Sequence, residues 1–246
     1  GHSFGPDSHE VQDVLARLDG TLGTLLERLD AEVGRDGYVL ALSADHGVAT
    51  VPEAARATGQ SAGRVPLGAV RDTVDKALAA LGTGPHVARA EYTQVYLTRQ
   101  ARAQATAATM APAIAGLRAM PGILAAVWNG DLDAPNAAVA PNLLEAIRAG
   151  YVPDSSGDIT IVPKPGWILV IGSSPNGGDG TTHGSPHVYD QHVPLIFLGQ
   201  PFQPGHYGAR VTPADLAPTL AATIGVPMSD VEGRPLVDVS RRAPPR

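Results

Sequence analysis

The 246-residue sequence contains no cysteine. Disulfide bonds and thiolate metal ligands are therefore excluded. Any metal ion that this chain binds must be held by histidine nitrogen or by the oxygen of aspartate, glutamate or a hydroxyl group. The eight histidines of the sequence are thus the first candidates for a metal site.

The sequence also lacks an excess of positive charge and a long apolar run. It carries 18 Lys and Arg against 24 Asp and Glu, a net charge of −6, which argues against nucleic-acid binding through a basic surface. No apolar stretch reaches the ~18 residues that a membrane-spanning helix needs. With 43% hydrophobic and 17% charged residues, the composition is typical of a globular protein.

The beginning of the sequence lacks a signal peptide and an initiator methionine. It starts with Gly1-His2-Ser3-Phe4, with no strand or helix ahead of this loop. We therefore expect a fragment, or a chain that has been cut at its N-terminus. On that expectation, the missing signal carries no information about the cellular compartment.

A helix followed by a short buried strand leads to the first candidate site. Apolar residues recur at helical spacing from Val11 to Val33, and the apolar run Tyr38–Leu42 has the length of a core strand. Asp45 and His46 follow this strand, and both residue types bind zinc. Ligands of open α/β sheets bind beyond the carboxyl ends of strands, although the tripeptide Asp-His-Gly alone also fits an ordinary turn.

The middle of the chain has a different pattern. Residues 48–63 are expected to form a surface loop. After it, the pattern predicts a helix, two strands, an alanine-rich helix and another strand, at 69–81, 87–92, 94–97, 101–120 and 123–128. This order suits a small α+β subdomain at about Arg64–Trp128, inserted in the main fold. No reactive cluster is evident in it, and His86 is expected to be structural or solvated.

The rest of the chain contains a histidine-rich loop. The predicted helices and strands around it lie at 142–149, 158–162, 167–171, 193–198 and 212–224. Residues Pro163–Gly166 indicate a hairpin between two of these strands. A loop rich in Gly, Ser and Asn, 172–180, in which Asp179 is expected to be a turn residue, opens into Thr181–His192. The basic tail from Ser240 is expected to fray.

Three loops now carry candidate metal ligands, which are His2, the pair Asp45 and His46, and His183. Each also has an ordinary interpretation, in which His2 is a solvated terminal residue and the later histidines merely lie on a loop. Taken together they favour a metal site, because three loops each offer histidine in a chain without sulfur. Mixed sets of Asp and His suit zinc.

The motifs GHSFGP, SADHG and THGSPHVYDQHVPLIFLG, in this order, resemble the alkaline phosphatase superfamily. They are most similar to the branch of bacterial alkaline phosphatases that shares its core with type I phosphodiesterases and nucleotide pyrophosphatases. The segment Asp215–Gly233 is similar to the closing helix of that superfamily. The resemblance covers both ends of the chain and skips the middle insert.

This resemblance implies an α/β fold with a mostly parallel sheet sandwiched by helices and with the metal loops at its carboxyl edge. The whole chain, 1–246, would be the C-terminal part of one alkaline-phosphatase-like domain. The inserted α+β subdomain, 64–128, is expected to lie near the same edge as a cap that narrows access of the substrate.

The resemblance also implies two zinc ions bridged by the phosphate of the substrate. His2 and His183 match the histidines of the first ion, and Asp45 and His46 match two ligands of the second ion. Loop length leaves His187 as an alternative to His183. The remaining ligands and the Thr or Ser nucleophile are expected upstream of the first residue, so the isolated fragment is expected to be inactive.

Other residues of the histidine-rich loop are given supporting roles. His187 and His192 would be structural, or they would contact the metal ligands without binding an ion themselves. Asp190 and Tyr189 are expected to orient the loop by hydrogen bonds.

The resemblance implies a hydrolase that acts on small phosphate monoesters by two-zinc phosphoryl transfer. A phosphodiesterase or nucleotide pyrophosphatase on the same core is the first alternative, because the groups that separate the two activities lie upstream. A non-catalytic metal-binding or structural remnant is an alternative of another class, and a sulfatase fits less well. Such phosphatases are usually exported, so a periplasmic or secreted location is expected. The oligomeric state is left open.

Overall fold

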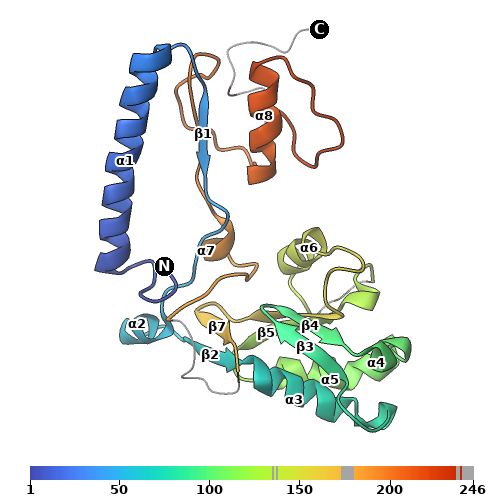
Figure 1. Cartoon of the computed structure of the whole chain (residues 1–246). Helices are drawn as coiled ribbons and strands as arrows, with labels where there is room; N and C mark the ends of the chain where they lie inside the picture. The colour runs from blue at the N-terminus through green and yellow to red at the C-terminus, as the bar shows by residue number, and fades with distance from the viewer. Residues whose placement is uncertain (135, 137, 173–179, 237–238, 240–246) are drawn as a thin grey trace. The chain divides into compact units, whose positions relative to one another are not determined.

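The structure is a computed structural model, and it describes residues 1–134, 136, 138–172, 180–236 and 239 (Figure 1). The chain divides into two compact units. The first consists of Gly1–Val11 and Val48–Gln191, and the second of Gln12–Gly47 and His192–Arg246. The predicted loop residues 173–179, with Asp179, and the predicted tail from Ser240 lie outside the described residues.

The first unit contains a four-stranded antiparallel sheet with the strand order β3-β4-β6-β5. The strands are Val87–Glu91 (β3), Gln94–Leu97 (β4), Ile123–Trp128 (β5) and Ile159–Pro163 (β6). All five residues of β6 are buried. Such a continuous buried run is expected for a central strand that is covered on both faces.

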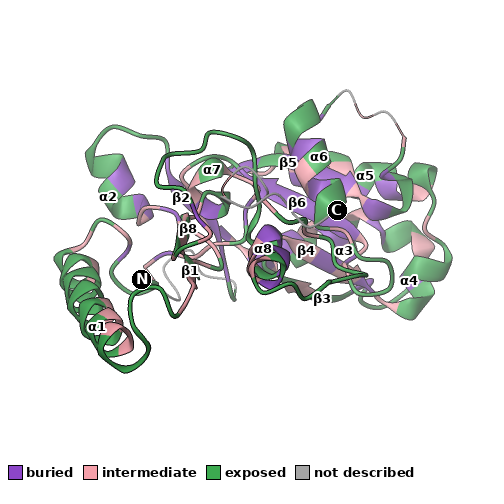
Figure 2. Cartoon of the chain, turned by 90° about the horizontal axis from the view of Figure 1, so that it is seen from above, coloured by how far each residue is buried: buried purple, intermediate pink, exposed green. Residues whose placement is uncertain are grey.

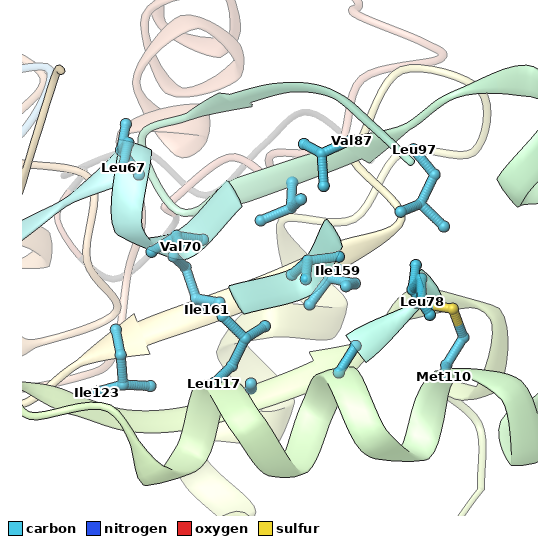
Figure 3. Close-up of a cluster of buried hydrophobic side chains, with 14 of the residues drawn as sticks. Leu67, Val70, Leu78, Val87, Leu97, Met110, Leu117, Ile123, Ile159 and Ile161 are labelled. Atoms are coloured by element: carbon cyan, nitrogen blue, oxygen red, sulfur yellow. The ribbon is translucent and has the colours of Figure 1, made fainter. Parts of the chain in front are cut away.

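Helices cover both faces of this sheet. α3 (Leu67–Ala77) and α5 (Ala107–Ala119) pack against one face and form the main hydrophobic core with it (Figure 3). α6 (Pro141–Ala149) covers the other face, where its apolar side chains pack against Val127 and Val162. Figure 2 shows the buried residues gathered in these strands and on the inner sides of the helices. Burial of apolar surface on both faces is the main stabilising contribution in this unit.

The side chain of Leu117 on α5 provides a test of this core. Leu117 is 0% exposed, so Leu117→Ala leaves a cavity and should lower the free energy of unfolding by about 2–5 kcal/mol. Urea denaturation followed by tryptophan fluorescence measures the change. Leu124→Ala is the control, because Leu124 on β5 is 43% exposed and its loss should cost no more than about 0.5 kcal/mol. Equal effects of the two substitutions would contradict the described packing.

A two-stranded parallel sheet in the same unit joins β2 (Gly63–Pro66) to β7 (Trp167–Val170). The predicted hairpin between 158–162 and 167–171 is therefore wrong. β6 already has β4 and β5 on its two edges, so β7 must pair with another strand. The predicted turn itself forms, because the Trp167 N–H donates to the Lys164 carbonyl at 2.9 Å and Gly166 has a φ of +76°.

The second unit contains β1 (Leu40–Ser43), paired antiparallel with β8 (Leu195–Leu198). α1 spans His9–Val33 and belongs to this unit from Gln12 onward. Near the end of the chain the 3₁₀ helix η3 (Pro213–Asp215) leads into α8 (Leu216–Thr223). Thr212 and Asp215 form a capping box where the predicted helix 212–224 begins.

Strand direction differs from the prediction of a mostly parallel sheet. Among the described strands, the β2–β7 pair is parallel and the other four pairs are antiparallel. Parallel pairing needs a long crossover, and the β2–β7 pair has all of residues 67–166 for it. β3 and β4 are joined by a two-residue turn at Tyr92 and Thr93, which permits only antiparallel pairing.

Several predicted boundaries also change. The predicted helix 101–120 consists of α4 (Arg99–Ala103) and α5, because the Thr106 hydroxyl accepts the Thr109 N–H and caps a new helix. The predicted loop 48–63 contains α2 (Pro52–Ala57), with proline in its first turn. The remaining short helices are η1 (Ala79–Leu81), η2 (Asn129–Asp131) and α7 (Val188–Gln191).

The predicted insert, 64–128, stays a prediction. The four-stranded sheet also includes β6, which lies beyond that range. The insert's role as a cap for substrate is likewise a prediction.

Candidate metal centre

His2 is held in place by the backbone of Thr181. The Thr181 N–H donates to the His2 carbonyl at 2.8 Å, and Nδ1 of His2 lies 3.0 Å from the Thr181 carbonyl oxygen. A carbonyl oxygen only accepts hydrogen bonds, so Nδ1 carries the proton in this contact. Nε2 of His2 then keeps its lone pair for a metal ion.

The close approach of these two loops requires glycine. A Cβ atom on Gly180 would lie 2.5 Å from the carbonyl oxygen of Ser3, which is shorter than any normal contact. Gly5, with a φ of +82°, allows the first loop to turn against Val51. Gly5 in the motif GHSFGP and Gly180 in the facing loop therefore allow this approach, and a larger residue could replace neither.

His183 lies beside His2 in the first unit. The centroids of the two imidazole rings are 5.2 Å apart, and the ring planes are inclined by 53°. Two imidazoles on one tetrahedral zinc ion, with Zn–N bonds of about 2.0–2.1 Å, have their ring centroids about 5 Å apart. The observed separation therefore fits two ligands of one ion.

The other histidines of this loop have different surroundings. Nε2 of His187 lies 2.7 Å from the Pro163 carbonyl oxygen, and its ring centroid is 5.3 Å from that of Tyr189. His192 belongs to the second unit and is exposed. The structure thus brings His183 next to His2 and directs His187 to Pro163.

Asp45 and His46 follow β1 in the second unit. Oδ2 of Asp45 lies 3.5 Å from Nε2 of His46. Nδ1 of His46 lies 2.7 Å from the Gly47 carbonyl oxygen, so it carries the proton and Nε2 is the metal-binding nitrogen. Two donors of a tetrahedral zinc ion are about 3.3–3.5 Å apart, which matches this separation.

The two pairs fit zinc in chemistry and spacing, but each supplies only two donors. Among the residues that the structure describes, no group of three or more His, Asp or Glu side chains could hold one ion. Zinc takes three or four protein ligands in most sites. Further donors, from protein, water or substrate, must therefore complete the coordination of each ion.

Buried contacts hold the loop that carries His183. Thr181 is 0% exposed, and its hydroxyl donates to the Ala49 carbonyl at 2.7 Å. Arg64 donates to the Gly180 carbonyl at 2.7 Å and also pairs with Glu53. Further along the loop, the Asp190 carboxylate accepts hydrogen bonds from Ser185, and burial raises the pKa of Asp190. Asp190 thus orients the loop by hydrogen bonds, as the sequence predicts.

The Glu53–Arg64 pair predicts a dependence of stability on pH. The hydrogen bond from Arg64 lowers the pKa of Glu53 to about 2, from about 4.5 in the unfolded chain. A lowered pKa in the folded state stabilises the protein above pH 4.5, and this stabilisation is lost as the pH falls toward 2. Glu53→Gln should therefore flatten the fall in Tm over this range. Glu27→Gln, on the exposed surface of α1, should leave the fall unchanged. An unaltered acid profile in the Glu53 variant would contradict the pairing.

Sequence reasoning missed Tyr92. Its ring centroid lies 5.9 Å from that of His183, and its backbone φ is +47° in the turn between β3 and β4. A left-handed conformation is rare for a bulky residue, so no sequence signal marks this turn. Tyr92 lies in the predicted insert, where no reactive cluster was evident. His86, by contrast, is buried, which agrees with its structural interpretation.

Comparison with known proteins places the chain in a family. The model of the family "type I phosphodiesterase / nucleotide pyrophosphatase" matches residues 1–187. The chain therefore belongs to the type I phosphodiesterase/nucleotide pyrophosphatase family.

Individual relatives agree with this placement. A "Calcium-transporting ATPase" of Myroides odoratus is 32% identical over 231 residues, covering 92% of this chain and 41% of the relative. "Alkaline phosphatase PafA" of Elizabethkingia meningoseptica is 30% identical over 257 residues, covering 98% of this chain and 44% of the relative. The crystal structure of wild-type alkaline phosphatase PafA matches with a TM-score of 0.85 and 28% identity, over 97% of this chain and 45% of that chain.

These findings confirm the resemblance to the alkaline phosphatase superfamily and the alkaline-phosphatase-like α/β fold. The chain spans less than half the length of these curated relatives. Within the described ranges, no helix is both long and apolar enough to cross a membrane.

Proposed function

We propose that this chain supplies metal ligands of a phosphate monoester hydrolase that works by two-zinc phosphoryl transfer. The observation that carries the proposal is the pairing of His2 with His183, whose ring centroids are 5.2 Å apart. Membership of the family and the similarity to alkaline phosphatase PafA support a hydrolase of phosphoric esters.

In this proposal His2 and His183 hold one zinc ion, and Asp45 and His46 hold the second. Two metal ions in such a site activate the attacking oxygen and stabilise the leaving oxygen of a displacement at phosphorus. The carbonyl groups of Thr181 and Gly47 fix the proton of His2 and of His46, respectively, on Nδ1 and direct Nε2 of these two residues to the ion. The nucleophile is not assigned to any residue of this chain.

A phosphodiesterase or nucleotide pyrophosphatase is the second candidate, and the description of the matching family favours it. In both candidates the binding partner of the protein is its substrate, a small phosphate ester. We also propose export to the periplasm or the medium, which rests on the resemblance and is tested by fractionation of the cells that express the gene.

The experiment uses the complete product of the gene, purified and loaded with zinc. Its kcat/KM for p-nitrophenyl phosphate should exceed that for bis(p-nitrophenyl) phosphate by at least about tenfold. EDTA should abolish the activity, and added zinc should restore it. The reverse order of the two substrates would favour the diesterase. Hydrolysis of neither substrate by the zinc-loaded protein would favour a non-catalytic metal-binding or structural remnant.

A further inference from the structure

Two buried polar atoms close to His183 have no hydrogen-bond partner among the described residues. They are the hydroxyl oxygen of Tyr189 and Oδ1 of Asp190. Asp190 is only 4% exposed. A buried carboxylate oxygen without a donor is costly, so each such atom in a folded protein requires an explanation.

The two oxygens of Asp190 have different tasks. Oδ2 accepts the Ser185 N–H at 2.8 Å and the Ser185 hydroxyl at 2.6 Å. These bonds fasten a residue that comes two positions after His183. Oδ1 has no such donor among the described residues, so its partner must come from the space beside it.

That space is a small pocket that Asp190 shares with His183. Tyr189, Thr182 and Ser185 also line it. Its free volume of about 20 Å³ exceeds the ~10–15 Å³ that one water molecule needs. A buried water also needs two to four polar partners, and the lining of this pocket supplies them.

We propose that one ordered water molecule binds between the Tyr189 hydroxyl and Oδ1 of Asp190 and links Asp190 to His183. This water donates a hydrogen to Oδ1 and accepts hydrogen bonds from the Tyr189 hydroxyl and from the ring N–H of His183. Asp190 is then a positioning residue for His183, because a carboxylate that acts on the outer nitrogen of a histidine fixes its tautomer and ring orientation. The metal-binding part of this inference rests on the proposed function.

The first test is a crystal structure of the protein at a resolution that shows ordered water. We expect one solvent peak within about 2.6–3.2 Å of both the Tyr189 hydroxyl oxygen and Oδ1 of Asp190. A pocket without such a peak would overturn the proposal, and so would a direct bond between Asp190 and His183. This test needs no bound zinc, so it remains decisive if the proposed function fails.

The second test is zinc affinity, measured by competition with a chelator on the complete gene product. Asp190→Asn and Tyr189→Phe each remove one partner of the water, and Asp190→Asn should weaken zinc binding by about 10–100-fold. Tyr189→Phe should remove the solvent peak and should also weaken zinc binding, by a smaller factor than Asp190→Asn. The Tyr189 variant keeps the test decisive if the Asp190 variant fails to fold.

The matched control is Tyr96→Phe, because the hydroxyl of Tyr96 donates to Ser155 elsewhere in the first unit. Its zinc affinity should equal that of the unaltered protein. Unchanged zinc affinity in both pocket variants would overturn the positioning role. A wild-type protein that binds no zinc would instead overturn the proposed function. The ordered water would then be tested by the crystal structure alone.

Discussion

His183→Ala is expected to lower kcat/KM for p-nitrophenyl phosphate by more than about 100-fold in the complete gene product, because residues that merely support a metal ligand already contribute 10–100-fold. The same substitution should remove about one of the two zinc ions per molecule, which metal analysis after dialysis measures. The reason is geometric. The ring centroid of His183 lies 5.2 Å from that of His2, and alanine removes this neighbouring imidazole from His2.

His187→Ala is the matched control from the same loop. Nε2 of His187 bonds to the Pro163 carbonyl oxygen at 2.7 Å, so this substitution removes one hydrogen bond and no metal ligand. Both zinc ions should remain, and kcat/KM should fall by less than about tenfold. Loss of zinc from the His187 variant, with full occupancy in the His183 variant, would contradict the choice of ligand.

Asp45→Asn is expected to have an effect of similar size on the second ion. The amide keeps the shape of the side chain but replaces an anionic donor with a neutral one, which weakens the attraction for a divalent cation. We expect kcat/KM to fall by more than about 100-fold and zinc occupancy to fall by one ion per molecule. Assays over a range of zinc concentrations should recover part of the activity, because His46 remains as a donor for this ion.

Asp19→Asn provides the control for this loss of charge, because Asp19 is an exposed residue of α1 in the same unit. It removes the same formal charge and should change neither zinc content nor activity. An Asp45 variant that keeps two zinc ions and full activity would rule out the assignment of Asp45 as a ligand.

Much of the local structure could be predicted from the sequence because the signals are local. The Ser8 hydroxyl accepts the Val11 N–H at 3.2 Å and caps α1 just before the predicted apolar periodicity begins at Val11. The start of the closing helix at residue 212 was also predicted. These features depend on residues three or four positions apart, which is the range that periodicity and capping rules describe.

Strand pairing could not be predicted in the same way, because it depends on partners far away in the sequence. The turn at Pro163–Gly166 was identified correctly, but nothing near it shows that β6 has both edges covered. The parallel direction predicted for most strand pairs was wrong for the same reason. β1 ends at Ser43, one residue beyond the predicted strand, and its partner is the antiparallel β8, about 150 residues further along the chain.

The candidate site likewise has residues that local motifs predicted and residues that depend on distant contacts. His2, Asp45, His46 and His183 were chosen from short motifs, and the spacing within each observed pair suits zinc. Tyr92 was missed because its left-handed turn and its approach to His183 are tertiary features. The role of Gly180 also depends on the distant Ser3, whose carbonyl leaves no room for a Cβ atom.

The most direct test of the central claim is a crystal structure of the zinc-loaded complete gene product, with diffraction data collected on both sides of the zinc absorption edge. We predict two anomalous peaks, one within about 2.0–2.2 Å of Nε2 of His2 and of a ring nitrogen of His183, and one within the same distance of an Asp45 carboxylate oxygen and Nε2 of His46. Zinc peaks away from these four residues, in a protein that is fully active, would contradict the account.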